Sequence, residues 1–367
     1  MRRLGVMLFE QPARTSNKFE MWTKVPEALV TVVSDRDGWG ADRTIVCEVA
    51  RLPLLGGTEA WTAAPAMLRG VDLIPADDID VVASHELYSF TTFQAARFAK
   101  QHGLPHVVHI SETMPRNIVY WLPPYALIAR RTVRGASWFV CTTERARQHA
   151  IALGCDGDRA TVVHSGIDLA RFHPAPGGPV EANEVLFVGM LRANRGADKG
   201  VRELVAAGDI LAAEGLAFRI RIVGDGHLRE ELEMAAATRP FLEVVGRIPR
   251  DEIPALMRSS RVFVLPSKRT WKWEEQFGFV LAEAMASGIP VVSTTCGSIP
   301  EIVEPGNDLV IQGDPIALAD AIRRALGPGA AERGAANRAW AEDHFDLGRQ
   351  AARIRGALDS ALEREDR

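Results

Sequence analysis

The chain has 367 residues, of which 47% are hydrophobic and 25% are charged. This ordinary mixture excludes a disordered chain, a collagen-like repeat and a small disulfide scaffold, and the length fits about two domains. The net charge of −4 gives no sign of nucleic acid as a main ligand. The four cysteines are too sparse for a disulfide framework and lack metal-ligand spacing.

The first residues do not have the pattern of a secretion signal. Met1-Arg2-Arg3 precedes the apolar run Leu4–Phe9, which Glu10 ends. A signal peptide needs a longer apolar region and a small-residue cleavage site. No stretch approaches the ~18 apolar residues of a membrane span. We therefore expect a cytoplasmic protein with reduced cysteines.

Short apolar runs alternate with helical patterns in the first half of the chain. Helices are predicted between several of these runs, for example at 93–101 and 127–134. Strands that alternate with helices indicate a parallel sheet covered on both faces. The predicted strands are 3–9, 44–49, 81–83, 106–110, 138–141 and 160–163.

A linker rich in proline and glycine, His173–Pro179, interrupts this alternation. Strands are predicted after it at 185–188, 218–223, 242–245, 262–265 and 290–293, and helices at 201–213, 227–237, 251–258 and 279–287. A last helix starts near Leu347 and carries an apolar stripe that has to pack on a neighbour, with the first domain as a candidate. The expected divisions are a first domain at 1–172, a linker at 173–182, a second domain at 183–340 and a C-terminal helix at 341–367.

The segment Glu275–Val291 is the most informative one. Gly278 opens a predicted helix and Gly288-Ile289-Pro290 closes it, so Glu275 stands just before the helix and Glu283 inside it. Eight helical residues rise about 12 Å, roughly the span from the sugar to the ribose of a nucleotide sugar. Carboxylates accept hydrogen bonds from vicinal hydroxyls, and the free amides of a first helical turn suit a diphosphate. Taken alone, the two glutamates would indicate solvated residues on a surface helix, and the surrounding motif is what favours a binding role.

Further motifs around this segment resemble those of the retaining GT-B glycosyltransferases of family 4, also called group 1. The resemblance is strong over about residues 160–325 and rests only on pattern in the N-terminal half. It implies an α/β GT-B fold, in which two Rossmann-like parallel-sheet domains face each other across a cleft and the C-terminal helix crosses back to the first. The motifs are Ser165–Pro174, Phe187–Gly189, Lys199-Gly200, Ile222–Gly226, Val245–Arg247, Val264–Ser267, Glu275–Val291 and Ile299–Val303.

The resemblance assigns the donor to the second domain. It implies that Glu275 holds sugar hydroxyls, that Glu283 holds the ribose and that Lys199 binds the diphosphate. The alternative for Lys199 is a solvated lysine at a helix start. Backbone amides near Phe277 and Gly278 would meet the sugar or its phosphate, and Ile248 would lie near the base. The implied donor-binding residues are Arg192, Arg195, Lys199, Gly224, Ile248, Glu275, Phe277, Gly278 and Glu283.

The sequence departs from the family pattern at two places. Met190 stands where the family often has an arginine on the diphosphate, so Arg192 or Arg195 would have to supply that charge, with Arg192 favoured; either can also be a solvated loop residue. The loop 11–19 lacks the family's frequent Gly-Gly, which leaves a close backbone approach to phosphate unsupported.

In the first domain, ligands are expected beyond the carboxyl ends of parallel strands. His109 resembles the family histidine that faces the donor sugar and joins Lys199 and Glu275 as a candidate catalytic residue. The acceptor side is assigned to His85, Glu86 and Glu112. Hydrogen-bonded structural roles are the alternative for both histidines. Three aromatic residues fit either an acceptor site or ordinary packing: Tyr120, Trp121 and Tyr125.

The implied activity is that of a hexosyltransferase-type glycosyltransferase. It would move a sugar from a nucleotide diphosphate sugar to an acceptor hydroxyl with retention at the anomeric carbon. The leaving diphosphate would take the acceptor's proton, so electrostatic stabilisation of that group is the main task of the protein. A nucleotide-sugar epimerase of the same architecture and a non-catalytic sugar-nucleotide-binding protein remain as alternatives.

No cofactor and no metal is expected, because the donor is a substrate and the three Asp-x-Asp stretches at 35–37, 78–80 and 156–158 lie in or beside predicted turns. The acceptor is a small molecule, a saccharide or a lipid-linked compound, and nucleic acid is not expected. The basic run Arg130–Arg134 is a candidate for weak contact with a membrane surface, with a solvated helix face as the alternative.

Overall fold

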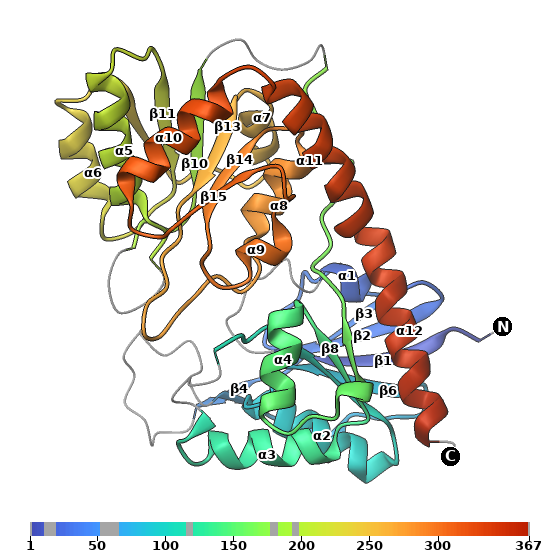
Figure 1. The fold of residues 1–367 in the computed structure, drawn as a ribbon. Coiled ribbons are helices and arrows are strands. Elements are labelled where there is room, and N and C mark those ends of the chain that lie inside the picture. The colour runs from blue at the N-terminus through green and yellow to red at the C-terminus, as the bar shows by residue number, and fades with distance from the viewer. Residues whose placement is uncertain are drawn as a thin grey trace. The chain divides into compact units, whose positions relative to one another are not determined.

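The predicted alternation of strands and helices is the architecture observed in the computed structural model, which describes residues 2–10, 20–51, 66–114, 120–176, 183–192 and 198–365 (Figure 1). The chain divides into two units, one formed by Met1–Gly166 with Leu347–Arg367 and the other by Ile167–Asp346. The chain enters the second unit at Ile167, earlier than the boundary at 172 drawn from the sequence. The reason is that the Ile167 amide donates to the Phe345 carbonyl oxygen at 2.7 Å and its side chain packs in the second core.

Within the described residues, the first unit contains a seven-stranded sheet whose strands are all parallel. The order is β3-β2-β1-β6-β7-β8-β9. Strand β2 was not predicted from the sequence. The single strand predicted at 44–49 is two strands, β3 and β4, and β4 pairs antiparallel with β5. The bounds are β1 Leu4–Phe9, β2 Ala28–Ser34, β3 Arg43–Val46, β4 Val49–Arg51, β5 Ala66–Leu68, β6 Val81–His85, β7 His106–Ile110, β8 Trp138–Cys141 and β9 Ala160–Val162.

The predicted C-terminal helix is confirmed as α12, Leu347–Glu365. Its apolar stripe includes Ile354, Leu358 and Ala361, and these side chains are buried in one cluster with Trp22 and Val140 of the first unit. Burying this stripe stabilises the helix, because apolar area leaves water. The other helices of the unit are α1 Glu20–Thr23, α2 Phe90–His102, α3 Tyr125–Gly135 and α4 Glu144–Ala152, with short 3-10 turns η2 Val71–Leu73 and η4 Gly157–Arg159.

The second unit repeats the plan with a six-stranded parallel sheet among its described residues. The order is β12-β11-β10-β13-β14-β15. The predicted strands and helices of this half are all found, with small differences at their ends. The bounds are β10 Glu184–Val188, α5 Val201–Ala213, β11 Arg219–Val223, α6 Arg229–Ala236, β12 Leu242–Gly246, α7 Ile253–Arg258, β13 Val262–Leu265, α8 Phe279–Ala286, β14 Val291–Thr294, α9 Ile299–Ile302, β15 Asp308–Val310, α10 Pro315–Leu326 and α11 Ala330–His344.

The strand orders indicate where each sheet can bind a ligand. In the second sheet the chain runs outward on one side of β10 through β11 to β12, and on the other side through β13 to β15. The first sheet does the same on either side of β1. Open parallel sheets bind ligands beyond the carboxyl ends of the strands at such a reversal. The loops that follow β10 and β13, and those that follow β1 and β6, are therefore the places to examine.

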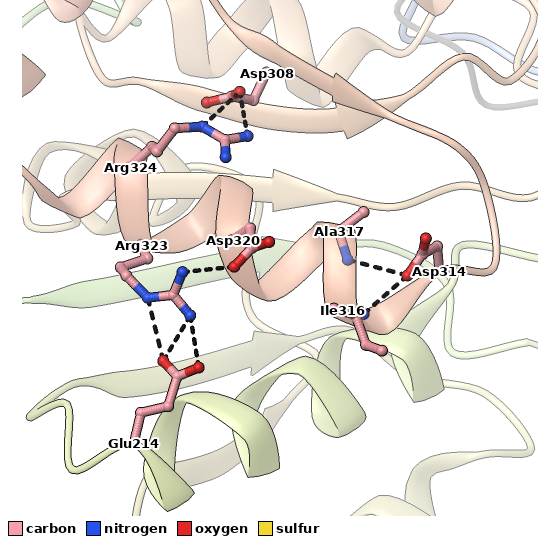
Figure 2. Close-up of polar contacts among 8 residues, drawn as sticks. All are labelled: Glu214, Asp308, Asp314, Ile316, Ala317, Asp320, Arg323 and Arg324. Atoms are coloured by element: carbon pink, nitrogen blue, oxygen red, sulfur yellow. Dashed lines mark hydrogen bonds and ion pairs between the residues drawn. The ribbon is translucent and has the colours of Figure 1, made fainter.

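Helix α10 illustrates how the outer helices are fixed (Figure 2). The Asp314 carboxylate accepts hydrogen bonds from the amides of Ile316 and Ala317, both at 3.0 Å, and so caps the helix start. Near the other end, Arg323 donates to Glu214 and Asp320. Exposed ion pairs of this kind contribute about 0–1 kcal/mol each, so the cap is the stronger local determinant.

We expect Asp314→Ala to lower the free energy of unfolding by about 1 kcal/mol, because two amides of the first turn lose their acceptor. Urea unfolding followed by circular dichroism is the measurement. Asp320→Ala, which removes only a surface partner of Arg323, is the control and should change the value less. Equal effects of the two substitutions would contradict the capping role.

Candidate functional site

A buried ion pair lies at the carboxyl edge of the second sheet. Lys199 Nζ donates to Glu275 Oε2 at 2.6 Å, and the Ser267 hydroxyl donates to the same oxygen at 3.0 Å. The side chains of Lys199 and Glu275 are only 13% and 9% exposed. The alternative in which these two residues are solvated surface side chains is therefore wrong.

The backbone around Lys199 is held against the loop that follows β13. Gly200 has φ 68°, and a Cβ at this position would lie 1.9 Å from the carbonyl oxygen of Pro266. The Asp198 carboxylate accepts from the Gly200 amide at 2.9 Å, and the Lys268 amide donates to the Asp198 carbonyl oxygen at 2.8 Å. Only glycine permits this close approach, so the Lys-Gly pair fixes where the ammonium group lies.

The backbone of Glu275 is held by the loop after β14. The Ser298 amide donates to the Glu275 carbonyl oxygen at 2.9 Å, and a Cβ on Gly297 would lie 2.1 Å from that oxygen. The ring of Trp273 lies below the ammonium group, with its centroid 4.7 Å from Lys199 Nζ. This distance allows a cation–π attraction that holds the positive charge in a partly buried position.

Sequence reasoning missed several members of this cluster. Ser267 was counted only as part of a motif, and Trp273 and Glu274 were not considered. Glu274 is 1% exposed and lies 3.2 Å from the guanidinium of Arg269. A signal was present in the sequence, since Trp273-Glu274-Glu275 combines an aromatic residue with two carboxylates directly before a Phe-Gly helix start.

Helix α8 begins as predicted, with Gly278 in the left-handed region at φ 81° and no side-chain cap. Phe277 is buried and packs against Phe279 and Phe345 at centroid distances of 5.1 and 5.6 Å. Its side chain belongs to the core, so only the backbone at Phe277 and Gly278 is available to a ligand. Because the helix starts at Phe279, half of the stretch from Glu275 to Glu283 is loop, and the estimate of 12 Å from an all-helical stretch is wrong.

Glu283 is the second buried carboxylate of this helix. It is 4% exposed, and Arg250 donates to its Oε1 at 3.1 Å. Burial raises the pKa of Glu283 to about 7, while the charges of Arg250 and Arg171 act in the opposite direction. The expected alternative of a solvated glutamate is wrong here too, and neither arginine was a candidate at the sequence level.

Three other predicted donor residues have different surroundings. Gly224 has φ 150°, and a Cβ there would lie 1.8 Å from the carbonyl oxygen of Gly189, so this glycine brings the loops after β10 and β11 together. Ile248 is half-buried against the second core. Arg192 is exposed, and no ion pair joins it to any residue that the structure describes. Arg195 and the loop 11–19 lie outside the described residues.

In the first unit, the predicted histidines end neighbouring strands. His85 and His109 are directly paired in the β6–β7 register, and their Nδ1 atoms lie 3.2 Å apart. Glu86 has φ 64°, an uncommon conformation for a residue other than glycine, and its amide donates to the His109 carbonyl oxygen at 2.8 Å. Glu112 Oε1 accepts from the amides of the two residues that follow it. The structure thus brings His85, Glu86 and His109 together.

The three aromatic residues separate into two kinds. Tyr120 and Tyr125 are buried and pack edge-to-face on Tyr88 at centroid distances of 5.4 and 6.4 Å, which supports the packing alternative. Trp121 is 71% exposed. The aromatic cluster therefore leaves one side chain available to a partner.

Carboxylates of the Asp-x-Asp stretches accept hydrogen bonds from backbone amides. Asp37, Asp80 and Asp156 accept from the amides of Gly38, Gly5 and Asp158 at 2.7, 2.7 and 3.0 Å. The described residues include no group of three or more His, Cys, Asp or Glu side chains arranged to hold a metal ion. Among the same residues, no helix combines the length and apolarity needed to cross a membrane.

The raised pKa of Glu283 predicts a specific pH dependence of stability. The folded state holds this proton more tightly than the unfolded chain, so its contribution is complete below pH 4.5 and is lost as pH rises from 4.5 to about 7. Relative to Glu283→Gln, the free energy of unfolding of the unmodified chain should fall by about 3 kcal/mol over this range. Urea unfolding at several pH values tests this, with exposed Glu230→Gln as the control. Parallel curves for the chain and Glu283→Gln would show that burial does not perturb this carboxyl.

Comparison with known proteins agrees with these observations. The sequence profile of the family described as "Glycosyl transferases group 1" matches residues 182–327, and that of "Glycosyl transferase 4-like domain" matches residues 27–166. The 2-deoxystreptamine glucosyltransferase of Streptomyces kanamyceticus is 31% identical over 324 residues, which is 80% of each chain. WcaL of Salmonella typhimurium, named for colanic acid biosynthesis, is 36% identical over 179 residues, 46% of this chain. That match spans only 42% of the length of WcaL.

A solved structure supports the fold assignment. HepE of Anabaena, in complex with UDP and glucose, has a TM-score of 0.75 at 19% identity, and the match covers 98% of this chain and 100% of HepE. The fold has two parallel-sheet α/β units, and the family motifs surround Lys199 and Glu275. Relatives match most of the length of the chain, and these observations agree. The chain belongs to the GT-B glycosyltransferases of family 4, the group 1 glycosyltransferases.

Proposed function

We propose that this glycosyltransferase takes its sugar from a nucleotide diphosphate sugar and transfers it to an acceptor hydroxyl with retention. The observation that carries the proposal is the buried Lys199–Glu275–Ser267 cluster beside the start of α8, a place where helix amides lack a side-chain cap. Further support comes from HepE, whose structure holds UDP and glucose, and from a relative that is a glucosyltransferase.

The cluster has capacity left for a donor. In the described part of the chain, both hydrogen bonds on the Glu275 carboxylate go to Oε2, which leaves Oε1 to accept from sugar hydroxyls. Lys199 uses one of its three N–H groups on Glu275 and has two for a diphosphate. In surroundings of low polarity, a fixed ammonium stabilises developing negative charge more strongly than it would in water.

The reaction then needs no side-chain nucleophile. The bond between the anomeric carbon and the donor phosphate oxygen breaks, and the acceptor oxygen bonds to that carbon on the same face. The acceptor's proton passes to the leaving diphosphate. Lys199 supplies the positive charge that such a leaving group requires, which is consistent with a metal-independent hexosyltransferase.

Glu283 and Arg250 form the proposed ribose end of the site. The carboxylate form of Glu283 accepts hydrogen bonds from the two ribose hydroxyls, and Arg250 favours that form by its charge. Donor binding would therefore draw this buried carboxyl toward ionisation. The half-buried side chain of Ile248 is assigned to the base.

Lys199→Ala should lower kcat/KM for donor turnover by roughly a hundredfold to a thousandfold, because the leaving diphosphate loses its fixed positive partner. The assay uses a panel of UDP-, GDP- and ADP-sugars, with donor hydrolysis as the readout until the acceptor is known. Asp156→Ala, which alters a turn of the first unit, is the control and should change the rate little.

Small and equal effects of both substitutions would refute this donor site. Conversion of the donor to an epimer without acceptor would support the isomerase alternative. Tight donor binding with no turnover for any acceptor would support a binding protein. Circular dichroism of each variant shows whether a lost rate reflects lost folding.

We further propose that α3 docks on an anionic phospholipid surface and that the acceptor is lipid-linked. Leu127, Arg130, Arg131 and Arg134 are all exposed and follow the spacing of one helix face. Trp121 and Leu122 precede this face and are 71% and 39% exposed. We call these six residues the arginine face.

The arginine face has three neighbouring arginines without an acidic partner among the described residues. Many exposed arginines of the chain, such as Arg202, Arg239 and Arg324, pair with a carboxylate. None of the arginines at 130, 131 and 134 has an acidic partner in the ranges the structure describes, and α3 itself contains no acidic residue. Unneutralised arginines beside exposed tryptophan and leucine match the interface of an anionic bilayer.

Replacing Arg130, Arg131 and Arg134 together by serine should weaken binding to phosphatidylcholine vesicles that contain phosphatidylglycerol by roughly a hundredfold at low salt, since each arginine contributes about 1 kcal/mol. Vesicle co-sedimentation measures this, with pure phosphatidylcholine vesicles as the neutral reference. The charge-matched control replaces the paired Arg229, Arg239 and Arg323 by serine. Trp121→Ser should also weaken binding, whereas Trp271→Ser, at a tryptophan 67% exposed in the second unit, should not. Equal loss for both triple variants would exclude the arginine face as the docking surface.

A further inference from the structure

A row of buried polar side chains crosses the carboxyl edge of the first sheet. It consists of Glu10 directly after β1, His85 at the end of β6, His109 near the end of β7 and Thr142 directly after β8. These are four adjacent strands of the sheet. The four residues are 0 to 4% exposed. Since buried polar groups have to satisfy each other, the contacts in this row determine where its hydrogens lie.

Trp22 of α1 determines the state of His109. Its indole Nε1 lies 3.3 Å from His109 Nδ1, and an indole N–H can only donate. His109 Nδ1 must therefore present a lone pair, and the hydrogen of the neutral ring lies on Nε2. That nitrogen is 3.0 Å from Thr142 Oγ1. Thr142 can accept this hydrogen bond because its own hydroxyl donates to the Ile110 carbonyl oxygen at 3.3 Å.

The same reasoning fixes the hydrogen of His85. Its Nδ1 lies 3.2 Å from His109 Nδ1, which is an acceptor, so His85 Nδ1 carries a hydrogen and donates. On the other side of the ring, His85 Nε2 is 3.6 Å from Glu10 Oε2. One proton has to lie between these two groups, because a bare nitrogen lone pair would otherwise face a carboxylate.

The remaining titratable groups at this edge do not change the assignment. Glu86 contacts His109 through its own amide, which donates to the His109 carbonyl oxygen. Its carboxylate accepts from the Ser111 amide at 3.3 Å. The Glu112 carboxylate accepts from the amides of Thr113 and Met114. None of these hydrogen bonds involves a ring nitrogen of His109.

We infer that Trp22 and His85 hold His109 as a neutral ring whose Nε2 hydrogen is donated to Thr142, so that the ring is a hydrogen-bond donor within this row and not a base. Trp22 and His85 are positioning residues that act through His109. Any effect of this arrangement on donor turnover rests on the proposed function. The protonation state of the ring follows from the contacts of the first unit alone.

Long-range proton–nitrogen spectra of 15N-labelled protein test the protonation state without any assay of activity. Between about pH 5 and pH 8, His109 should show an unprotonated Nδ1 and a hydrogen on Nε2 throughout. Exposed His102 serves as the internal reference. Trp22→Phe should allow a second tautomer or a protonated ring to appear, whereas Glu10→Gln should change the His85 signals and leave the His109 tautomer in place. A protonated His109, or a hydrogen on its Nδ1, in the unmodified chain would overturn the inference.

Donor turnover gives a second readout. Glutamine can supply a neutral N–H but cannot act as a base, so His109→Gln should keep at least about tenfold more activity than His109→Leu. Equal inactivity of both variants would refute the donor role. If the spectra agree with the inference and Lys199→Ala is fully active, then the proposed donor site has failed while the tautomer assignment stands.

Discussion

The ion pair between Lys199 and Glu275 is the constraint around which the second unit is arranged. A buried pair contributes little net stability, since loss of hydration offsets the attraction of the charges. Removal of one partner is costly, because the other charge remains buried without compensation. The fold nevertheless brings three loops to this point, with Gly200 against Pro266 and Gly297 against Glu275. Such an arrangement is easier to explain by a charged ligand than by folding stability.

The two glutamates of the motif have different polar partners. Glu275 accepts hydrogen bonds from an ammonium group and a hydroxyl on one oxygen. The partner of Glu283 is the half-exposed guanidinium of Arg250. The effect of burial exceeds the effect of that charge, so the pKa of Glu283 rises to about 7. The two carboxylates of one spacing pattern thus lie in different surroundings, and burial raises the pKa of Glu283 to a value near neutrality.

Much of the fold was predictable because its requirements are local. Apolar runs predict β10 and β13, and Gly278 predicts the start of α8, where φ 81° favours glycine. The short strand β15 has no fully buried residue, and its three-residue apolar run Leu309–Ile311 was not predicted as a strand. Of the site, the sequence identified Lys199, Glu275 and Glu283 through a family pattern. It did not identify Arg250, because a surface arginine reaches Glu283 only through the packing of distant segments.

The first unit shows why residue type alone does not give a role. His109 was a candidate catalytic residue from its place at a strand end, and a histidine there can be a base, an acid or a neutral donor. The choice depends on Trp22, which lies 87 positions earlier in the chain and reaches the ring through α1. Indole offers only a donor, so it removes the base role at Nδ1, and the packing of Trp22 under α12 holds it in place. Three-dimensional contact supplies here the chemical information that the strand pattern lacks.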